Sequence, residues 1–197
     1  MSASAVEANS GTTPVRPGYA LDLAALDAWM RDRVPDYAGP LHVEQFRGGQ
    51  SNPTYKLVTP RKSYVLRKQP PGPLLKGAHA LDREAKVLAG LGRAGFPVAA
   101  VHGVCTDPQI LGTLFYVMDM VEGRIFWDAA LPGLETRERG QLFDAMNATI
   151  ASLHGIDYEA VGLGDYGRPG NYFERQIARW SKQYLRSEEH TSELQSH

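Results

Sequence analysis

The chain has 197 residues, of which 43% are hydrophobic and 22% are charged, and its formal net charge is −1. These values are typical of an ordinary globular protein, and the near-neutral charge argues against a nucleic-acid-binding protein, which usually carries a basic surface. No apolar run approaches the ~20 residues that a membrane-spanning helix needs. The only cysteine, Cys105, has no intrachain disulfide partner, so we expect a cytoplasmic protein with neither nucleic-acid nor membrane partners.

The two ends of the chain differ in composition from the rest. Residues 1–17 are rich in Ser, Ala, Thr, Gly and Pro without periodicity, which predicts disorder. Residues 186–197 resemble, letter for letter, the translation of a common sequencing-library adapter, and such a segment would not belong to the natural fold. A genuine polar tail is the alternative. With the adapter interpretation, the natural sequence is broken off near Leu185.

Residues 18–121 are predicted to form a sheet-rich lobe. Apolar residues at helical spacing predict a first helix over residues 21–34. A second helix is expected at residues 80–91, with Gly92 as its cap, and it falls between the third and fourth of five predicted strands. The first three strands and the fifth are expected at residues 41–46, 54–59, 63–68 and 113–120, and residues 97–105 are expected to be a loop that enters a short fourth strand.

Residues 122–185 have a different, helical pattern. Apolar residues recur on one face over residues 137–153 and again over residues 172–185, which predicts two amphipathic helices. A glycine-rich loop, residues 162–170, separates them. We therefore expect the beginning of a second, helical lobe.

A glycine turn followed by basic residues indicates a phosphate site. Gly48 and Gly49 lie between the first two predicted strands, and Arg67 and Lys68 end the third. Glycine lets the backbone approach an anion closely, and a basic side chain neutralises its charge. Two glycines between strands are by themselves most often just a turn, so the context decides.

Glu84 is the second unusual residue of this lobe. It falls within the apolar stripe of the helix predicted at residues 80–91, and a carboxylate that faces a packed interior needs a partner. The basic residue of the third strand is the obvious candidate. If the helix is rotated, Glu84 is a surface residue instead.

Four segments taken together resemble the aminoglycoside phosphotransferase family, and within it the phosphotransferase domain associated with acyl-CoA dehydrogenases. They read GGQSNPTY, YVLRKQPPG, RE and FYVMDMVEG, at residues 48–55, 64–72, 83–84 and 115–123. The resemblance implies an α+β, protein-kinase-like fold. Its N-lobe would be an antiparallel five-stranded sheet with one inserted helix, followed by the first helices of an incomplete helical C-lobe.

The resemblance also implies roles in holding ATP. Arg67 stands where kinases have lysine, and Glu84 would pair with it. Lys68 is the second choice, because it points to the opposite face of an ideal strand. A loop would cover the triphosphate, formed by Gly48, Gly49, Gln50, Ser51 and Asn52. A hinge would offer backbone groups to the adenine, through Asp119 and Val121 with Met118 behind them.

The catalytic base and the magnesium ligands of that family are not found in this sequence. The family carries the base in a His-Gly-Asp-x-x-x-x-Asn motif, which would lie beyond Leu185, as would the magnesium-binding aspartate. The spacing of His42, His79 and His102 does not suggest a metal site. We therefore expect the chain as given to be inactive.

The complete protein would transfer the γ-phosphate of ATP, with magnesium, to a small-molecule hydroxyl. By analogy with the branch, a hydroxyacyl-CoA is one candidate acceptor, and an acyl-CoA dehydrogenase is a candidate fused or associated partner. The alternative is a non-catalytic nucleotide-binding or scaffold module that genuinely ends here.

Overall fold

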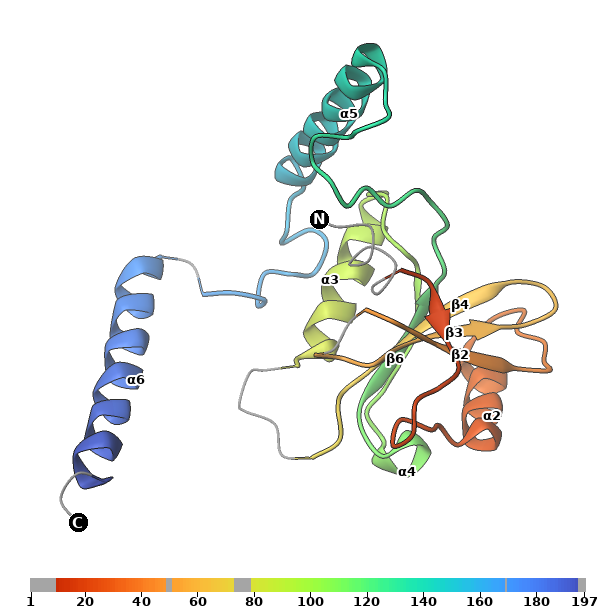
Figure 1. The fold of residues 1–197 in the computed structure, drawn as a ribbon, viewed down its shortest axis with the longest axis horizontal. Coiled ribbons are helices and arrows are strands. Elements are labelled where there is room, and N and C mark those ends of the chain that lie inside the picture. The colour runs from red at the N-terminus through yellow and green to blue at the C-terminus, as the bar shows by residue number, and fades with distance from the viewer. Residues whose placement is uncertain (1–9, 49–50, 73–78, 169, 195–197) are drawn as a thin grey trace.

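The computed structural model describes residues 10–48, 51–72, 79–168 and 170–194. Its centre is a six-stranded antiparallel sheet in the order β1-β2-β3-β4-β6-β5 (Figure 1). The strands are β1 (Thr12–Thr13), β2 (His42–Phe46), β3 (Thr54–Val58), β4 (Ser63–Lys68), β5 (Val101–Cys105) and β6 (Phe115–Asp119). The strand β6 pairs with β4 although α3, the edge strand β5 and α4 lie between them in the sequence.

The helix α2 (Leu23–Arg33) covers one face of the sheet. Its first turn is capped by Asp22, whose carboxylate accepts a hydrogen bond from the Ala25 N–H at 3.0 Å. Leu26 and Met30 are fully buried on the sheet side of the helix. The core on this face joins them to alternate residues of the strands, Val43, Tyr55, Leu57, Tyr64, Leu66, Cys105, Phe115 and Val117.

The helix α3 (Leu81–Arg93) packs on the opposite face, over β5 and β6 (Figure 1). Leu81, Ala85 and Tyr116 form its buried centre, and Leu88 and Met118 pack around them. The helix ends at Ala94, and Gly95 follows with a φ of +72°, a conformation that glycine adopts readily. The predicted cap, Gly92, instead lies inside the helix.

Two features at the edges of the sheet differ from the sequence prediction. The sheet has six strands and not five, because Thr12 and Thr13 pair with Phe46 and Gln45 at the start of the chain. The backbone N–H of Arg16 also donates to the Gln45 side chain at 3.1 Å. The prediction of disorder is therefore wrong for this part of residues 1–17. A short helix, α4 (Pro108–Leu111), connects β5 to β6.

The second half of the chain forms two helices that extend away from the sheet (Figure 1). The helix α5 (Thr136–His154) starts with a capping box formed by Glu135 and Glu138, and none of its residues is buried. The helix α6 (Tyr172–Leu194) continues well beyond Leu185, where the predicted helix ended. None of the described helices is long and apolar enough to cross a membrane.

Candidate nucleotide site

The ion pair between Arg67 and Glu84 links the end of β4 to the first turn of α3. The Nε of Arg67 lies 3.1 Å from the Oε1 of Glu84, and about a third of each side chain is exposed. The N–H is not aligned with this oxygen, so the contact is an ion pair and not a hydrogen bond. Among the described residues no group accepts a hydrogen bond from the guanidinium, so its terminal N–H groups have no described acceptor.

Tyr116 completes this cluster from β6. Its hydroxyl donates to the Oε1 of Glu84 at 2.5 Å, and its side chain is fully buried. Burial, and then the hydrogen bond to Glu84, raise the pKa of Tyr116 well above its ordinary value. Tyr116 therefore stays a donor at neutral pH. It lies opposite Arg67 in the β4–β6 ladder, so both side chains approach Glu84 from one face of the sheet.

The strand register separates Arg67 from Lys68. Arg67 lies opposite Thr54 and Tyr116, on the face that α3 covers, whereas Lys68 lies opposite Phe115, on the face that α2 covers. Burial lowers the pKa of Lys68. No bulge interrupts β4, so the structure brings Arg67 but not Lys68 to Glu84.

The glycine turn is described in part. Gly48, Ser51 and Asn52 belong to the described residues, whereas Gly49 and Gln50 lie outside them. Ser51 is exposed. The Oδ1 of Asn52 lies 2.7 Å from the Nδ1 of His79, which stands just before α3, so this contact ties the turn to that helix.

The predicted hinge, Asp119 to Val121, and Met118 behind it divide between the two faces of the sheet. Met118 lies opposite Val65 and packs against the α3 core, on the same face as Arg67. The side chain of Asp119 lies on the other face, opposite Tyr64. Val121 is exposed and borders an open hollow of about 580 Å³ together with Asp119, Arg61 to Ser63, Val98 to Ala100, Met120 and Glu122.

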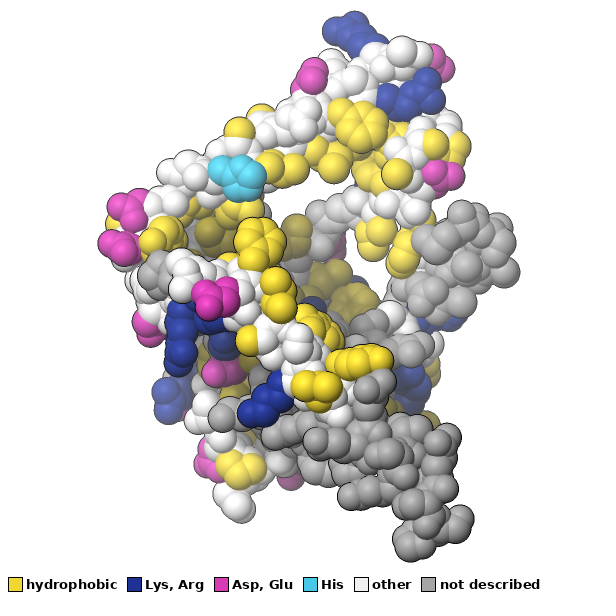
Figure 2. All heavy atoms as spheres, turned by 90° about the vertical axis from the view of Figure 1, so that its left-hand side faces the viewer, with side chains coloured by type: hydrophobic (Ala, Val, Ile, Leu, Met, Phe, Trp, Pro, Cys, Tyr) yellow, Lys and Arg dark blue, Asp and Glu magenta, His cyan; other side chains and the backbone are white. Residues whose placement is uncertain are grey.

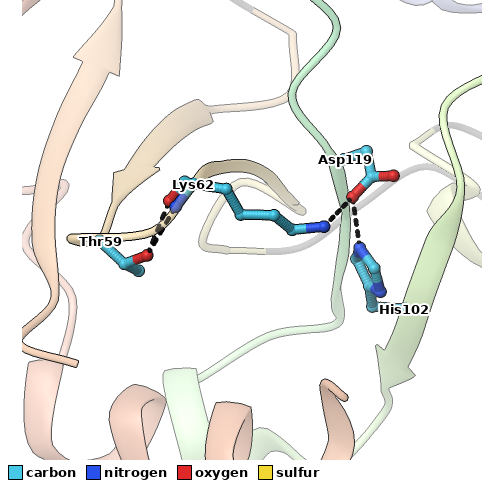
Figure 3. Close-up of polar contacts among 4 residues, drawn as sticks. All are labelled: Thr59, Lys62, His102 and Asp119. Carbon is cyan, nitrogen blue, oxygen red and sulfur yellow. Dashed lines mark hydrogen bonds and ion pairs between the residues drawn. The ribbon is translucent and has the colours of Figure 1, made fainter. Parts of the chain in front are cut away.

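Two side chains, Lys62 and His102, hold the carboxylate of Asp119 (Figure 3). Its Oδ1 lies 2.8 Å from the Nζ of Lys62 and 2.6 Å from the Nε2 of His102. Burial alone would raise the pKa of Asp119, but the hydrogen bonds from Lys62 and His102 outweigh it and lower this pKa. Thr59 fixes the Lys62 backbone by accepting from its N–H and donating to its C=O. The Asp119 side chain thus anchors the start of the predicted hinge.

The family model described as "Phosphotransferase enzyme family" matches residues 42–196. The chain belongs to this family. The match includes most of the segment that resembles an adapter translation. It also confirms the resemblance to the aminoglycoside phosphotransferases that the glycine turn, Arg67 and the hinge segment indicated.

Several relatives of this chain are named as acyl-CoA dehydrogenases. It is 45% identical to "Probable acyl-CoA dehydrogenase IBR3" of Arabidopsis thaliana, over 89% of this chain and 22% of that protein. It is 41% identical to "Acyl-CoA dehydrogenase family member 11" of Mus musculus, over 92% of this chain and 24% of that protein. The chain therefore spans about a quarter of these relatives or less.

A solved structure gives the fold. The crystal structure of a putative aminoglycoside phosphotransferase from Ralstonia eutropha JMP134 superposes with a TM-score of 0.74 at 50% identity, over 86% of this chain and 49% of that one. The predicted α+β, kinase-like fold is confirmed, with six strands in place of five. The sheet lobe thus corresponds to the N-lobe of this kinase-like fold, with α3 as its inserted helix.

Several residues that lie around this site were not predicted from the sequence. Tyr116, His102 and Lys62 had no predicted role at the site. The signal for Tyr116 was its place opposite Arg67, which becomes visible only once the β4–β6 register is known. Among the described residues no three His, Cys, Asp or Glu side chains gather into a possible metal site.

Proposed function

We propose that this chain contains the nucleotide-binding lobe of an ATP-dependent phosphotransferase that phosphorylates a small-molecule hydroxyl. The observation that carries the proposal is the Arg67 guanidinium. Glu84 holds it from one side, while its terminal N–H groups find no acceptor among the described residues. A fork of free donors fits phosphate oxygens geometrically and electrostatically.

In this proposal the glycine turn from Gly48 to Asn52 covers the phosphates. The backbone of Asp119 and Val121 meets the adenine, and Met118 borders it. Glu84 and Tyr116 do not touch the nucleotide, but they restrict where Arg67 can lie. Preorganised positive charge stabilises the charge on a transferring phosphoryl group.

Magnesium, when bound, would neutralise phosphate charge. The described residues offer no cluster of His, Cys, Asp or Glu side chains for it. The catalytic base and magnesium ligands are proposed to lie in sequence beyond Leu185. We also propose that the protein is cytoplasmic, that its acceptor is a hydroxyacyl-CoA and that it is associated with an acyl-CoA dehydrogenase.

The test compares neighbouring cations on opposite faces of β4. MgATP is titrated into the chain and its Arg67→Ala and Lys68→Ala variants, with Arg137→Ala on α5 as a control. We expect Arg67→Ala to weaken binding at least tenfold, because a charge-assisted contact contributes about 1.5–3 kcal/mol, and the other two to bind like the parent. If Lys68→Ala alone lost affinity, the assignment of Arg67 would be wrong.

Activity needs the longer protein, which is obtained by extending the reading frame in the source DNA beyond the codon for Leu185. A continuing frame with a His-Gly-Asp motif would support a phosphotransferase, and a natural stop codon would support a non-catalytic module. In the longer enzyme Arg67→Ala should raise KM for ATP and lower kcat.

A further inference from the structure

A segment that follows α5 is fastened along the outer side of α3. We call residues 161–166 the strap. At one end, the Nη2 of Arg93 donates to the C=O of Val161 at 2.5 Å. At the other end, the Nη2 of Arg83 donates to the C=O of Tyr166 at 2.7 Å, and its guanidinium lies 4.4 Å from the centre of the Tyr166 ring.

The middle of the strap is held by apolar packing as well as by the polar contacts at its ends. Val161 and Leu163 are buried, although they belong to a segment outside the sheet lobe. They lie against Gly90 of α3, where an added Cβ would come within 3.1 Å of Leu163 carbons and of the Val161 carbonyl oxygen. Lys86 also reaches Asp165, but this ion pair is exposed and contributes little.

The strap and Glu84 meet at the same place on α3. Glu84 follows Arg83 directly in the sequence. A hollow of about 420 Å³ is lined by Glu84 and Tyr166, together with Ala80, Arg83, Val87 and Leu88. On its sheet side, α3 packs through Leu81 and Ala85. On its opposite side, α3 contacts the strap through Arg83 and Arg93.

We propose that the strap positions α3 so that the carboxylate of Glu84 reaches Arg67. Arg83, Gly90 and Arg93 are then positioning residues, because they act on the site only through α3. A charge interaction at 3.1 Å weakens when the helix shifts, and interfaces of packed side chains shift between discrete positions. The consequence for ATP rests on the proposed function; the link from the strap to the ion pair does not.

The first measurement is the coupling between Arg67 and Glu84. A double-mutant cycle of Arg67→Met and Glu84→Gln, followed by urea unfolding at low protein concentration, gives this coupling as a ratio of unfolding constants. We expect a ratio of about threefold in the parent chain, as is usual for a partly exposed pair. In the Arg83→Met and Arg93→Met backgrounds it should fall close to one.

The controls separate positioning from general stabilisation. Arg83→Lys keeps a cation over the Tyr166 ring and should restore part of the coupling, and Arg137→Met on α5 should leave it unchanged. A merely structural strap would lower the stability of every member of the cycle equally and leave the ratio intact. An unchanged ratio in both strap backgrounds would therefore overturn the proposal.

Milder variants cover the case in which the arginine variants do not fold. Tyr166→Leu removes the ring but keeps the carbonyl acceptor, and Gly90→Ala crowds Leu163. The same cycle in these backgrounds should show a smaller ratio than in the parent, and an unchanged ratio in both would count against the strap.

A parallel MgATP titration then tests the consequence for the site. If the parent chain binds and the strap variants bind several-fold more weakly, the strap acts on the nucleotide site. If the parent binds no ATP, the proposed function fails while the coupling ratio still decides the role of the strap. If binding stays unchanged although the ratio falls, the strap does not act on the nucleotide site, and that part of the proposal is overturned.

Discussion

At the scale of single residues, carboxylates placed beside donors organise the candidate site. Glu84 accepts a hydrogen bond from the Tyr116 hydroxyl and forms an ion pair with Arg67. Asp119 is in contact with Lys62 and His102. Each carboxylate joins neighbouring parts of the lobe, Glu84 joining α3 to β4 and β6. Both links are partly exposed, so water screens them and their geometry matters more than their energy.

The first prediction concerns the pH dependence of stability through Asp119. Its pKa is lowered below the ordinary value of 3.8 in the folded chain. The unfolded chain therefore binds the proton more readily, and the stabilising contribution is fully present above about pH 4 and lost as the pH falls through the folded pKa. The difference in unfolding free energy between the parent and Asp119→Asn should be largest near neutral pH and shrink below pH 4.

Urea unfolding from pH 3 to pH 7 measures this difference. Asp157→Asn, whose carboxylate accepts only from nearby backbone N–H groups, serves as a comparison on a segment outside the sheet. A difference for Asp119→Asn that did not change with pH would show that its charge is not what Lys62 and His102 stabilise.

At the scale of elements, α2 shows how burial on one face fixes a helix. Leu26 is fully buried and Leu23 is 47% exposed on the same helix. Leu26→Ala should destabilise the chain by about 2–5 kcal/mol, because it removes buried methylenes and leaves a cavity. Leu23→Ala should change stability by less than about 0.5 kcal/mol. Thermal unfolding of both variants tests this, and similar losses for the two would mean that α2 does not pack as described.

The elements that sequence patterns predicted correctly are those whose signal is local. The strand β4 begins and ends where alternation predicted, at Ser63 and Lys68, and α5 extends the predicted helix by one residue at each end. The strand β1 could not be predicted from its own sequence. Thr12 and Thr13 have no strand pattern and pair only because β2 offers an open edge.

The site could be predicted where the position of a residue follows from the pattern of a single helix or strand. The angular position of Glu84 in the apolar stripe of α3 indicated a basic partner on the third strand, and the Arg67–Glu84 ion pair confirms that expectation. Tyr116, His102 and the strap depend on contacts between segments far apart in the sequence. No single segment carries a signal for such contacts. The roles of these residues toward ATP stay predictions.

At the scale of the whole molecule, the sheet lobe is packed while α5 and α6 are not. Large apolar side chains are exposed at helical spacing on both helices, and they are Phe143, Met146, Ile150 and Leu153 on α5 and Phe173, Ile177, Trp180 and Tyr184 on α6. Figure 2 shows such apolar side chains at the surface of this half of the chain. Exposed stripes of this kind are usually interaction surfaces or cause aggregation.

We therefore predict that the 197-residue chain associates with itself at micromolar concentrations. Ile150 and Ile177 lie in the exposed stripes of α5 and α6. Replacing both with Glu should reduce the association, because a charge in each stripe disfavours burial between copies. Ala148→Glu with Ala178→Glu places the same two charges on the opposite faces of the same helices and should leave association unchanged. Sedimentation velocity over a range of concentrations distinguishes these outcomes. A parent chain that stays monomeric would show that the two stripes are tolerated by an isolated chain, and equal effects of the two variants would show that net charge, not the stripes, controls the association.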